Sequence, residues 1–300
     1  MKILITGGTG YLGKIVSKCL RSKGYEVLSV GKTKNDFEGI INCDLSNPDS
    51  ALIINKKIKP DLIIHLAAHI PKKTNMDATL ESYKGNVLTA QTVLKISKLN
   101  KSCPILNTSS ISVYGEAPFF FDGKFKEIDK VKPDSFYGRD KRTAEKIFLE
   151  SDSLSLSLRL SGLHGSGRKN GVVFNFINSI LFGNTISIPS PRTEIAPLWV
   201  QDAADGIMLA MDFLLSKKIP KIFNLAGSEV ITLSSLAEYI MKVSKKKVAI
   251  KAGKQPAVRR ILSTALIEKE LNFFTTPLQK WLSKEIFEVL ENRNKITLNR

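Results

Sequence analysis

The chain has 300 residues and a formal net charge of +17, with 45 Lys and Arg residues against 28 Asp and Glu. This length is enough to bury a large core, in one domain or two unequal ones, and the apolar fraction of 43% is ordinary for a globular protein. No apolar stretch is long enough to cross a membrane, no signal peptide is recognisable, and the three cysteines lack metal or redox spacing. We therefore expect a cytoplasmic protein without a metal site.

The positive charge has two interpretations. Lysines are spread along the whole chain, which favours an ordinary solvated surface. The alternative is attraction toward an anionic ligand, either a nucleotide-sugar or a nucleic acid. Because the chain has no stacking-aromatic motif and no zinc-finger spacing, nucleic acid is the less favoured partner.

The most informative stretch is residues 2–13, which read KILITGGTGYLG. A short apolar run typical of a buried strand is followed by a glycine-rich turn that leads into a helix. Gly7 permits the tight turn, Gly10 lets the backbone approach a pyrophosphate, and Gly13 lets the helix pack against the strand. The helix N-terminus then presents free N–H groups to the phosphates. This order of elements predicts a dinucleotide site.

The end of the second strand bears on the choice of dinucleotide. We expect a helix over residues 11–21 and a strand over residues 25–30. An acidic residue at the end of this strand would bind the adenosine ribose of NAD, but the chain has Gly31 followed by Lys32 and Lys34. Ammonium groups there suit the 2'-phosphate of NADP. The alternative is that these are ordinary exposed lysines, which leaves NAD possible.

Further strands alternate with helices along the chain, as in a doubly wound parallel sheet of Rossmann type. These strands are expected at residues 40–43, 61–66, 105–110, 155–160 and 222–225. We expect an α/β fold with a smaller C-terminal substrate-binding region. The Rossmann domain is assigned to residues 1–165 and 195–227, and the substrate-binding region to residues 166–194 and 228–300.

Three local features belong to this interpretation. Asn47 or Ser46 is expected to cap a helix that runs to about residue 57. A long helical pattern covers residues 77–99. His65 lies within an apolar strand, so we interpret it as packed rather than catalytic.

Tyr137 and Lys141 are four residues apart in a helical segment, so their side chains rise from one face. A free tyrosine has a pKa near 10, too high for a base at neutral pH. A neighbouring ammonium group and an oxidised nicotinamide ring would both lower that pKa. Tyr137 could then exchange a proton with a sugar hydroxyl while hydride moves to or from the cofactor. A Tyr and a Lys at this spacing are common on protein surfaces, so their position in the chain decides their meaning.

Several short motifs occur together in a characteristic order. They are TGGTGYLG at 6–13, Asp44-Leu45, HLAA at 65–68, Asn86, SSISVYG at 109–115, YGRDK at 137–141 and WVQDAADG at 199–206. With them the chain resembles the extended short-chain dehydrogenase/reductase family, specifically its nucleotide-sugar epimerase, dehydratase and reductase branch. The motifs cover nearly the whole chain.

The resemblance implies a role for each matching residue. Ser110 would hydrogen-bond the reacting oxygen, Tyr137 would be the acid/base, and Lys141 would hold the nicotinamide ribose and lower the pKa of the tyrosine. Asn86 would support the active site. The residues expected at the cofactor are Gly7, Gly10, Tyr11, Leu12, Gly13, Lys32, Asp44, Leu45, Leu66, Ala67, Ala68, Asn86, Tyr137 and Lys141.

The substrate side of the resemblance is less complete. Asn175, Arg192 and Arg259 are expected to contact a nucleotide diphosphate, for which the planar fork of arginine is well suited. Gly162 stands where relatives often carry a substrate-binding asparagine. The family's dehydratases usually carry Thr-Asp-Glu around the serine position, where this chain has Ser-Ile-Ser at residues 110–112, so dehydration is disfavoured.

Three functions follow from these observations. The first is an NADP-dependent oxidoreductase acting on a nucleotide-sugar, most of all a 4-keto reductase. The second is a 4-epimerase, which would use the same three residues and recycle its cofactor. The third is a dinucleotide-sensing or RNA-binding protein that has kept the fold without turnover. The resemblance also suggests a homodimer formed by the helices that follow strands four and five.

Overall fold

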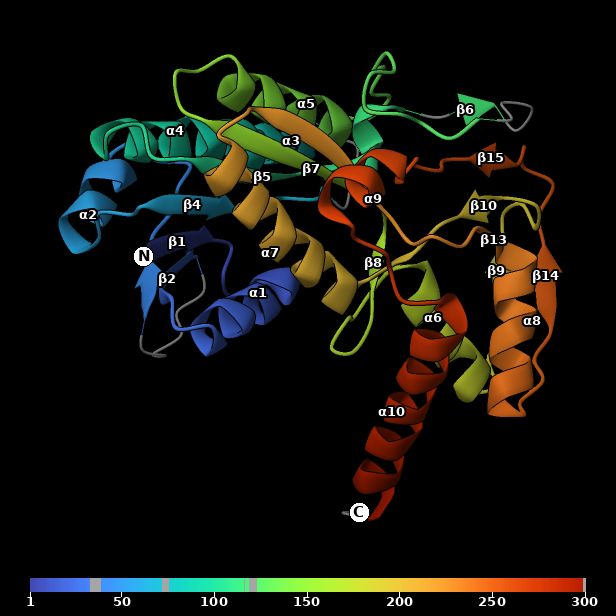
Figure 1. The fold of residues 1–300 in the computed structure, drawn as a ribbon. Coiled ribbons are helices and arrows are strands. Elements are labelled where there is room, and N and C mark those ends of the chain that lie inside the picture. Colours follow the sequence, from blue (N-terminus) through green and yellow to red (C-terminus); the bar gives the residue numbers. More distant parts are fainter. Residues whose placement is uncertain (33–38, 72–75, 116, 119–122, 299–300) are drawn as a thin grey trace.

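A parallel sheet forms the centre of the molecule in the computed structural model, which describes residues 1–32, 39–71, 76–115, 117–118 and 123–298 (Figure 1). In this described part the sheet has seven strands in the order β12-β7-β5-β4-β1-β2-β3, and every neighbouring pair is parallel. The strands are β1 (Lys2–Thr6), β2 (Glu26–Gly31), β3 (Ile40–Asn42), β4 (Leu62–His65), β5 (Ile105–Ser110), β7 (Ser155–Leu160) and β12 (Lys221–Leu225). This order is that of a doubly wound Rossmann fold, which confirms the predicted fold class.

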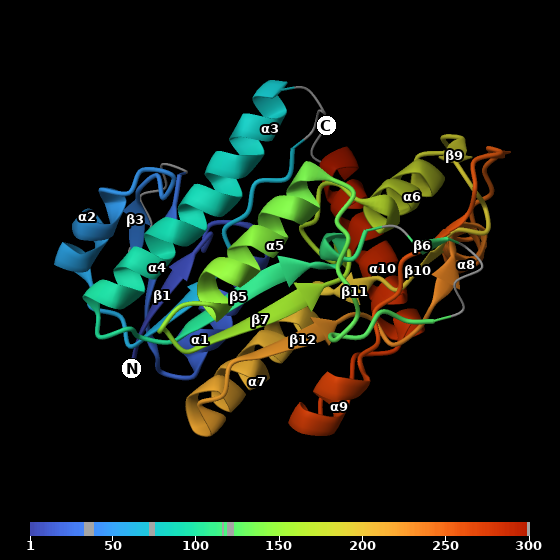
Figure 2. The ribbon, with the colours of Figure 1, turned by 90° about the horizontal axis from the view of Figure 1, so that it is seen from above.

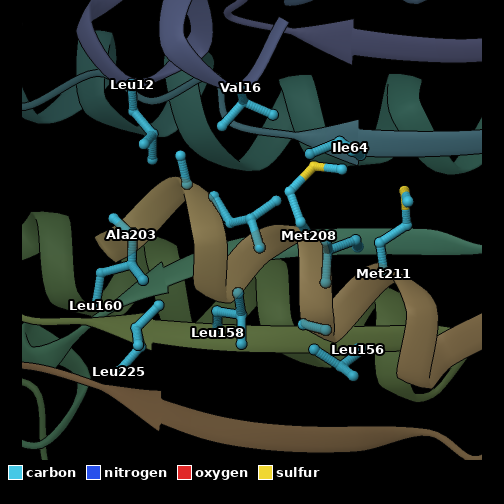
Figure 3. Close-up of a cluster of buried hydrophobic side chains, with 14 of the residues drawn as sticks. Leu12, Val16, Ile64, Leu156, Leu158, Leu160, Ala203, Met208, Met211 and Leu225 are labelled. Atoms are coloured by element: carbon cyan, nitrogen blue, oxygen red, sulfur yellow. The ribbon is translucent and has the colours of Figure 1, made fainter. Parts of the chain in front are cut away.

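Side chains alternate between the two faces of the sheet, and each face is covered by helices. Ile3 and Ile5 belong to one apolar cluster, whereas Leu4 between them belongs to the other. The helices on the first face are α1 (Tyr11–Ser22) and α7 (Val200–Lys217), and those on the second are α2 (Ser50–Lys57), α4 (Thr89–Leu99) and α5 (Phe136–Leu149). Figure 3 shows the first cluster, where Val16 of α1 and Met208 of α7 lie beside the sheet.

A second part of the molecule lies beyond one end of the sheet, as the view from above shows (Figure 2). It has its own apolar cluster, formed mainly by residues from two separate stretches of the chain, 172–195 and 231–290, with Trp199 packed against it. Its helices are α6 (Val172–Leu181), α8 (Leu233–Ser244) and α10 (Leu278–Leu298), and α9 (Ala265–Leu271) packs back toward α7. Among the described residues, no helix combines the length and apolar character needed to cross a membrane.

Short strands complete this second part and its junction with the sheet. They are β6 (Ala117–Pro118), β8 (Leu163–His164), β9 (Ile186–Ile188), β10 (Glu194–Ile195), β11 (Leu198–Trp199), β13 (Ile231–Thr232), β14 (Ile250–Ala252) and β15 (Val258–Arg259). They pair as β13-β10-β15-β6, as β11-β8 and as β14-β9.

The strands predicted at residues 105–110 and 155–160 are confirmed at both ends. The predicted helix over residues 77–99 is not uniform, because a π-helical turn, Lys84–Leu88, separates α3 (Met76–Tyr83) from α4. Asn86 lies in this turn, and its side-chain amide donates to the carbonyl of Ser82, a group that an α-helical backbone N–H would otherwise use.

The predicted cap of α2 is wrong. The helix begins at Ser50 after Asp49, and no side chain caps it. Asn47 instead accepts a hydrogen bond from the Asp49 N–H in a local turn before the helix (3.0 Å). Ser46 donates to the carboxylate of Asp44, so neither predicted cap reaches the helix.

Candidate active site

The glycine turn after β1 brings three elements into close contact. Gly7 has a φ of +71°, and a Cβ placed on it would lie 2.7 Å from the backbone nitrogen of Ala67, which follows β4. A Cβ on Gly13 would lie 2.1 Å from the carbonyl oxygen of Gly7. Both positions therefore exclude a side chain, so the turn lies against the chain after β4 and the first helix packs on the turn.

A cavity of about 1010 Å³ starts at this turn and runs along the carboxyl ends of the strands. Most of the predicted cofactor and catalytic residues line it together. They are Gly7, Gly10, Tyr11, Leu12, Lys32, Asp44, Leu45, Leu66, Ala67, Ala68, Ser110, Tyr137 and Lys141. The volume and the glycine cradle fit a dinucleotide, since the backbone approaches the cavity where a pyrophosphate needs N–H groups.

The three predicted catalytic residues come from two adjacent elements. Ser110 is the last residue of β5, and Tyr137 and Lys141 lie one turn apart near the start of α5. Gly138 makes their approach possible, because a Cβ there would lie 2.3 Å from the carbonyl oxygen of Ser112. Ser135 caps α5 by accepting a hydrogen bond from the Gly138 N–H (3.2 Å).

The pKa of Tyr137 differs from the sequence-based expectation. Burial raises it to about 12, while a hydrogen bond with Ser110 and the positive charge of Arg168 act in the opposite direction. Lys141 is not among the groups that lower it in this structure. In this structure the loss of solvent outweighs nearby positive charge, so the pKa of Tyr137 lies above its ordinary value.

Lys141 is almost fully buried, with 2% of its surface exposed. Burial lowers its pKa to about 8, and the carboxylate of Glu145, one turn further along α5, acts in the opposite direction. Within the described residues its ammonium group has no hydrogen-bond acceptor. Lys141 lines the large cavity, so this ammonium group can donate to a ligand hydroxyl there, such as that of a ribose.

We expect the affinity for a reduced dinucleotide, NADH or NADPH, to weaken as the pH rises through about 8. Lys141 is protonated below that pH, and a charged ammonium donates stronger hydrogen bonds than a neutral amine. A loss of about five- to tenfold is expected between roughly one pH unit below and one above the pKa. Fluorescence titration of NADPH at each pH measures it. The Lys141→Met variant should show weak, pH-independent binding, and an equal slope in both proteins would contradict this assignment.

At the end of β2, Lys32 forms an ion pair with Asp44 (Nζ to Oδ1, 2.9 Å). Burial acts to raise the pKa of Asp44, but hydrogen bonds from Ser46 and Lys32 outweigh it, so this pKa lies below its ordinary value. Both side chains are at least half exposed. Lys34 lies outside the described residues.

Asn86 and His65 do not line the large cavity but make hydrogen bonds to residues beside it. Asn86 accepts a hydrogen bond from the backbone N–H of His69 (3.0 Å) and donates to the carbonyl of the same residue (2.8 Å). His65 is buried and hydrogen-bonds the hydroxyl of Thr6 (2.6 Å). Burial and the charge of Lys141 lower the pKa of His65 to about 3, so it stays neutral. His65 is packed, as predicted.

The family model for the NAD dependent epimerase/dehydratase family matches residues 3–226, about three quarters of the chain. The chain belongs to this family. Its matched region contains the glycine turn, the cavity and the three predicted catalytic residues.

Curated relatives in this family include reductases of nucleotide-linked sugars. The dTDP-4-dehydrorhamnose reductase of Aggregatibacter actinomycetemcomitans is 33% identical over 176 residues, which are 57% of this chain and 54% of that protein. The chain thus aligns with about half the length of this relative. The dTDP-4-dehydro-6-deoxyglucose reductase of Escherichia coli is 28% identical over 279 residues, covering 82% and 83% of the two chains.

Solved structures show the same fold. The UDP-glucose 4-epimerase of Thermus thermophilus, solved in complex with NAD, superposes with a TM-score of 0.82 at 20% identity. The superposition covers 95% of this chain and 98% of that one.

In the present protein, the three residues predicted to bind the substrate do not line the large cavity. Asn175, on the first turns of α6, lines a second cavity of about 330 Å³. Arg259 forms an ion pair with Glu194 (Nε to Oε2, 3.1 Å), so its charge is shared with a carboxylate. Arg192 lines neither of these two cavities.

Two residues of the cavity region were not found from the sequence. Gly138 lies inside the YGRDK motif, and only the packing of α5 on residue 112 reveals its role. Arg168 lines the large cavity from the loop after β8, a region without a recognisable motif. An arginine in a glycine-rich loop was the available signal, but many surface loops share it.

Proposed function

We propose that this protein is an NADPH-dependent reductase of a 4-keto sugar carried on a nucleoside diphosphate. The observation that carries the proposal is the phenol of Tyr137, which lines the large cavity together with Ser110 and Lys141 and whose pKa is raised by burial, so that it keeps its proton at neutral pH. A reductase needs a proton donor at this place, whereas oxidation of an alcohol needs a base there.

The proposed reduction assigns a task to each residue. The bound cofactor supplies hydride to the carbonyl carbon. Ser110 donates a hydrogen bond to the carbonyl oxygen, which gains negative charge as the carbon is reduced. Tyr137 gives its proton to the same oxygen, because an alkoxide is more basic than a phenolate. Lys141 binds the cofactor ribose.

The second part of the molecule is assigned to the rest of the substrate. We infer that residues 166–194 and 228–300 hold the nucleotide, with Asn175 in the second cavity and the sugar in the large one. Arg192 and Arg259 remain predicted diphosphate contacts. The homodimer and the cytoplasmic location remain predictions as well.

The choice of NADPH rests on Lys32. We expect Lys32→Ala to weaken NADPH binding about five- to tenfold and to leave NADH binding within about twofold, because an ammonium group binds the 2'-phosphate and Asp44 would then repel it. Titration of both cofactors measures the ratio. Lys14→Ala, which removes an exposed charge outside the cavity, is the control. Equal losses for both cofactors would mean that Lys32 contacts a group that NADPH and NADH share, and unchanged binding of both would make it an ordinary surface lysine.

The test of function is NADPH consumption with a dTDP-linked 4-keto-6-deoxy sugar, chosen because two relatives are reductases of dTDP-linked sugars. Stoichiometric oxidation of NADPH with formation of the 4-hydroxy sugar supports the proposal. Interconversion of 4-hydroxy epimers with no net change in a tightly held cofactor would identify an epimerase instead. Cofactor binding without turnover of UDP-, dTDP- or GDP-linked keto sugars would indicate a sensing protein.

A further inference from the structure

A glycine-rich loop, residues 165–171, joins β8 to α6 at the wall of the large cavity. Gly165 has a φ of +126°, and a Cβ there would lie 3.0 Å from side-chain atoms of Trp199 and Val200. Gly167 has a φ of +81°, and a Cβ placed on it would lie 3.8 Å from the ring of Tyr11. These glycines allow the loop to pack on the helix that begins at the dinucleotide turn.

Arg168 extends from this loop over the same tyrosine. Its guanidinium carbon lies 5.3 Å from the centroid of the Tyr11 ring, and its Nε donates to the carbonyl oxygen of Asn170 (3.0 Å). These two contacts orient the guanidinium group. Within the described residues, its two terminal nitrogens have no hydrogen bond and no ion pair. Four N–H donors are therefore available to a ligand.

The loop that carries Arg168 lines both cavities. Arg168 lines the large cavity, while Gly171 and Val172, three and four residues later, line the second one with Asn175. The large cavity also contains Tyr137, whose phenol is close enough to experience the charge of Arg168. A ligand that reaches from the second cavity to Tyr137 therefore passes this loop.

Arg259, the other arginine considered for diphosphate binding, differs from Arg168 because it is already paired with a carboxylate. Arg259 faces Glu194 across neighbouring strands, so an anion there must compete with a carboxylate. Among the described residues Arg168 forms no ion pair, although the carboxylates of Glu285 and Glu288 act on the same Tyr11 ring. Of the two, Arg168 is the better prepared for a doubly charged anion.

We propose that Arg168 binds a diphosphate through its two terminal nitrogens, at the junction of the two cavities. The inference rests on the proposed function, which supplies two sources of this group: the nucleoside diphosphate of the sugar substrate and the pyrophosphate of the dinucleotide. A planar guanidinium binds two phosphate oxygens in parallel, which an ammonium does not.

Binding measurements on purified protein test the proposal without requiring turnover. Isothermal titration calorimetry compares wild type, Arg168→Met, Arg168→Lys and the control Lys169→Met with NADPH, with UDP, dTDP and GDP, and with the matching monophosphates. Lys169 is the adjacent exposed residue and lines neither cavity. Arg168→Met should lose about 10- to 100-fold in affinity for the diphosphate, Arg168→Lys should recover part of it, and Lys169→Met should change it less than about twofold.

The probes separate the two sources. Weaker binding of a nucleoside diphosphate with unchanged NADPH binding assigns Arg168 to the substrate, and weaker NADPH binding alone assigns it to the cofactor. Unchanged affinities, equal losses for mono- and diphosphates, or a wild type that binds no probe would overturn the proposal. Thermal unfolding of each variant excludes loss of fold as the cause. A wild type that binds NADPH but reduces no keto sugar would refute the proposed reduction. The binding affinities of the Arg168 variants would still show whether Arg168 binds a diphosphate.

Discussion

Tyr137→Phe is expected to lower kcat for the proposed reduction by about 100- to 10,000-fold, the usual contribution of a positioned acid or base. The ring stays, so the packing of α5 is kept, but the proton that the new alkoxide needs is gone. NADPH affinity should change less than about twofold, because Lys141 and the glycine turn still bind the cofactor. Single-turnover oxidation of NADPH, measured beside equilibrium titration, separates the two effects.

Tyr83→Phe is the matched control, since Tyr83 is an exposed tyrosine of α3 and does not line the cavity. It should leave both kcat and NADPH binding unchanged. A kcat for Tyr137→Phe within tenfold of the wild type would mean that another group donates the proton. It would also favour a protein that senses the dinucleotide without chemistry on a sugar.

Arg159→Met is expected to lower the free energy of unfolding by about 3–5 kcal/mol. Arg159 and Glu145 are almost fully buried and form a bidentate pair, from Nε to Oε1 and from Nη2 to Oε2, both at 2.9 Å. Arg159 also donates to the hydroxyl of Tyr114 (2.8 Å). Without the arginine, the Glu145 carboxylate loses its principal buried partner. Chemical denaturation followed by circular dichroism measures the change.

Two comparisons identify the cause. Lys221→Met removes a partly exposed ion pair with Glu270 and should cost at most about 1 kcal/mol. The double variant Arg159→Met/Glu145→Leu should recover part of the lost stability, because apolar groups replace both members of a buried pair. A double variant as unstable as Arg159→Met would show that lost packing, and not an uncompensated charge, causes the effect.

The central sheet was predictable because its strands are buried on both faces. Residues 3–5 and 62–64 are continuous apolar runs, as strands buried on both faces require. The strands at residues 105–110 (ILNTSS) and 155–160 (SLSLRL) mix apolar and polar side chains, and both still begin and end where they were predicted. The short strands of the second part were not predictable, since segments such as Glu194–Ile195 have two residues and no periodicity. Tertiary contacts define them.

The site was predictable where backbone geometry demands a residue type. Gly7 and Gly13 are required by close approach, and Tyr137 and Lys141 share a helix face. Quantities that depend on burial were not predictable, and the raised pKa of Tyr137 is the main example. The position of Arg168 depends on a loop folding back on Tyr11, which no local pattern indicates.

The chain passes from the sheet to the second part and back, and this order restricts how the second part can be exchanged between related proteins. The stretch over residues 172–195 joins the second apolar cluster, the chain then returns to the sheet as α7 and β12, and residues from 231 onward complete that cluster. A fragment that stops at residue 165 lacks the helix that covers Leu156 and Leu158 (Figure 3). Recombination that transplants the second part must therefore use at least two junctions, one on each side of residues 198–225, and the incoming C-terminal stretch must also supply an α9 that packs on α7.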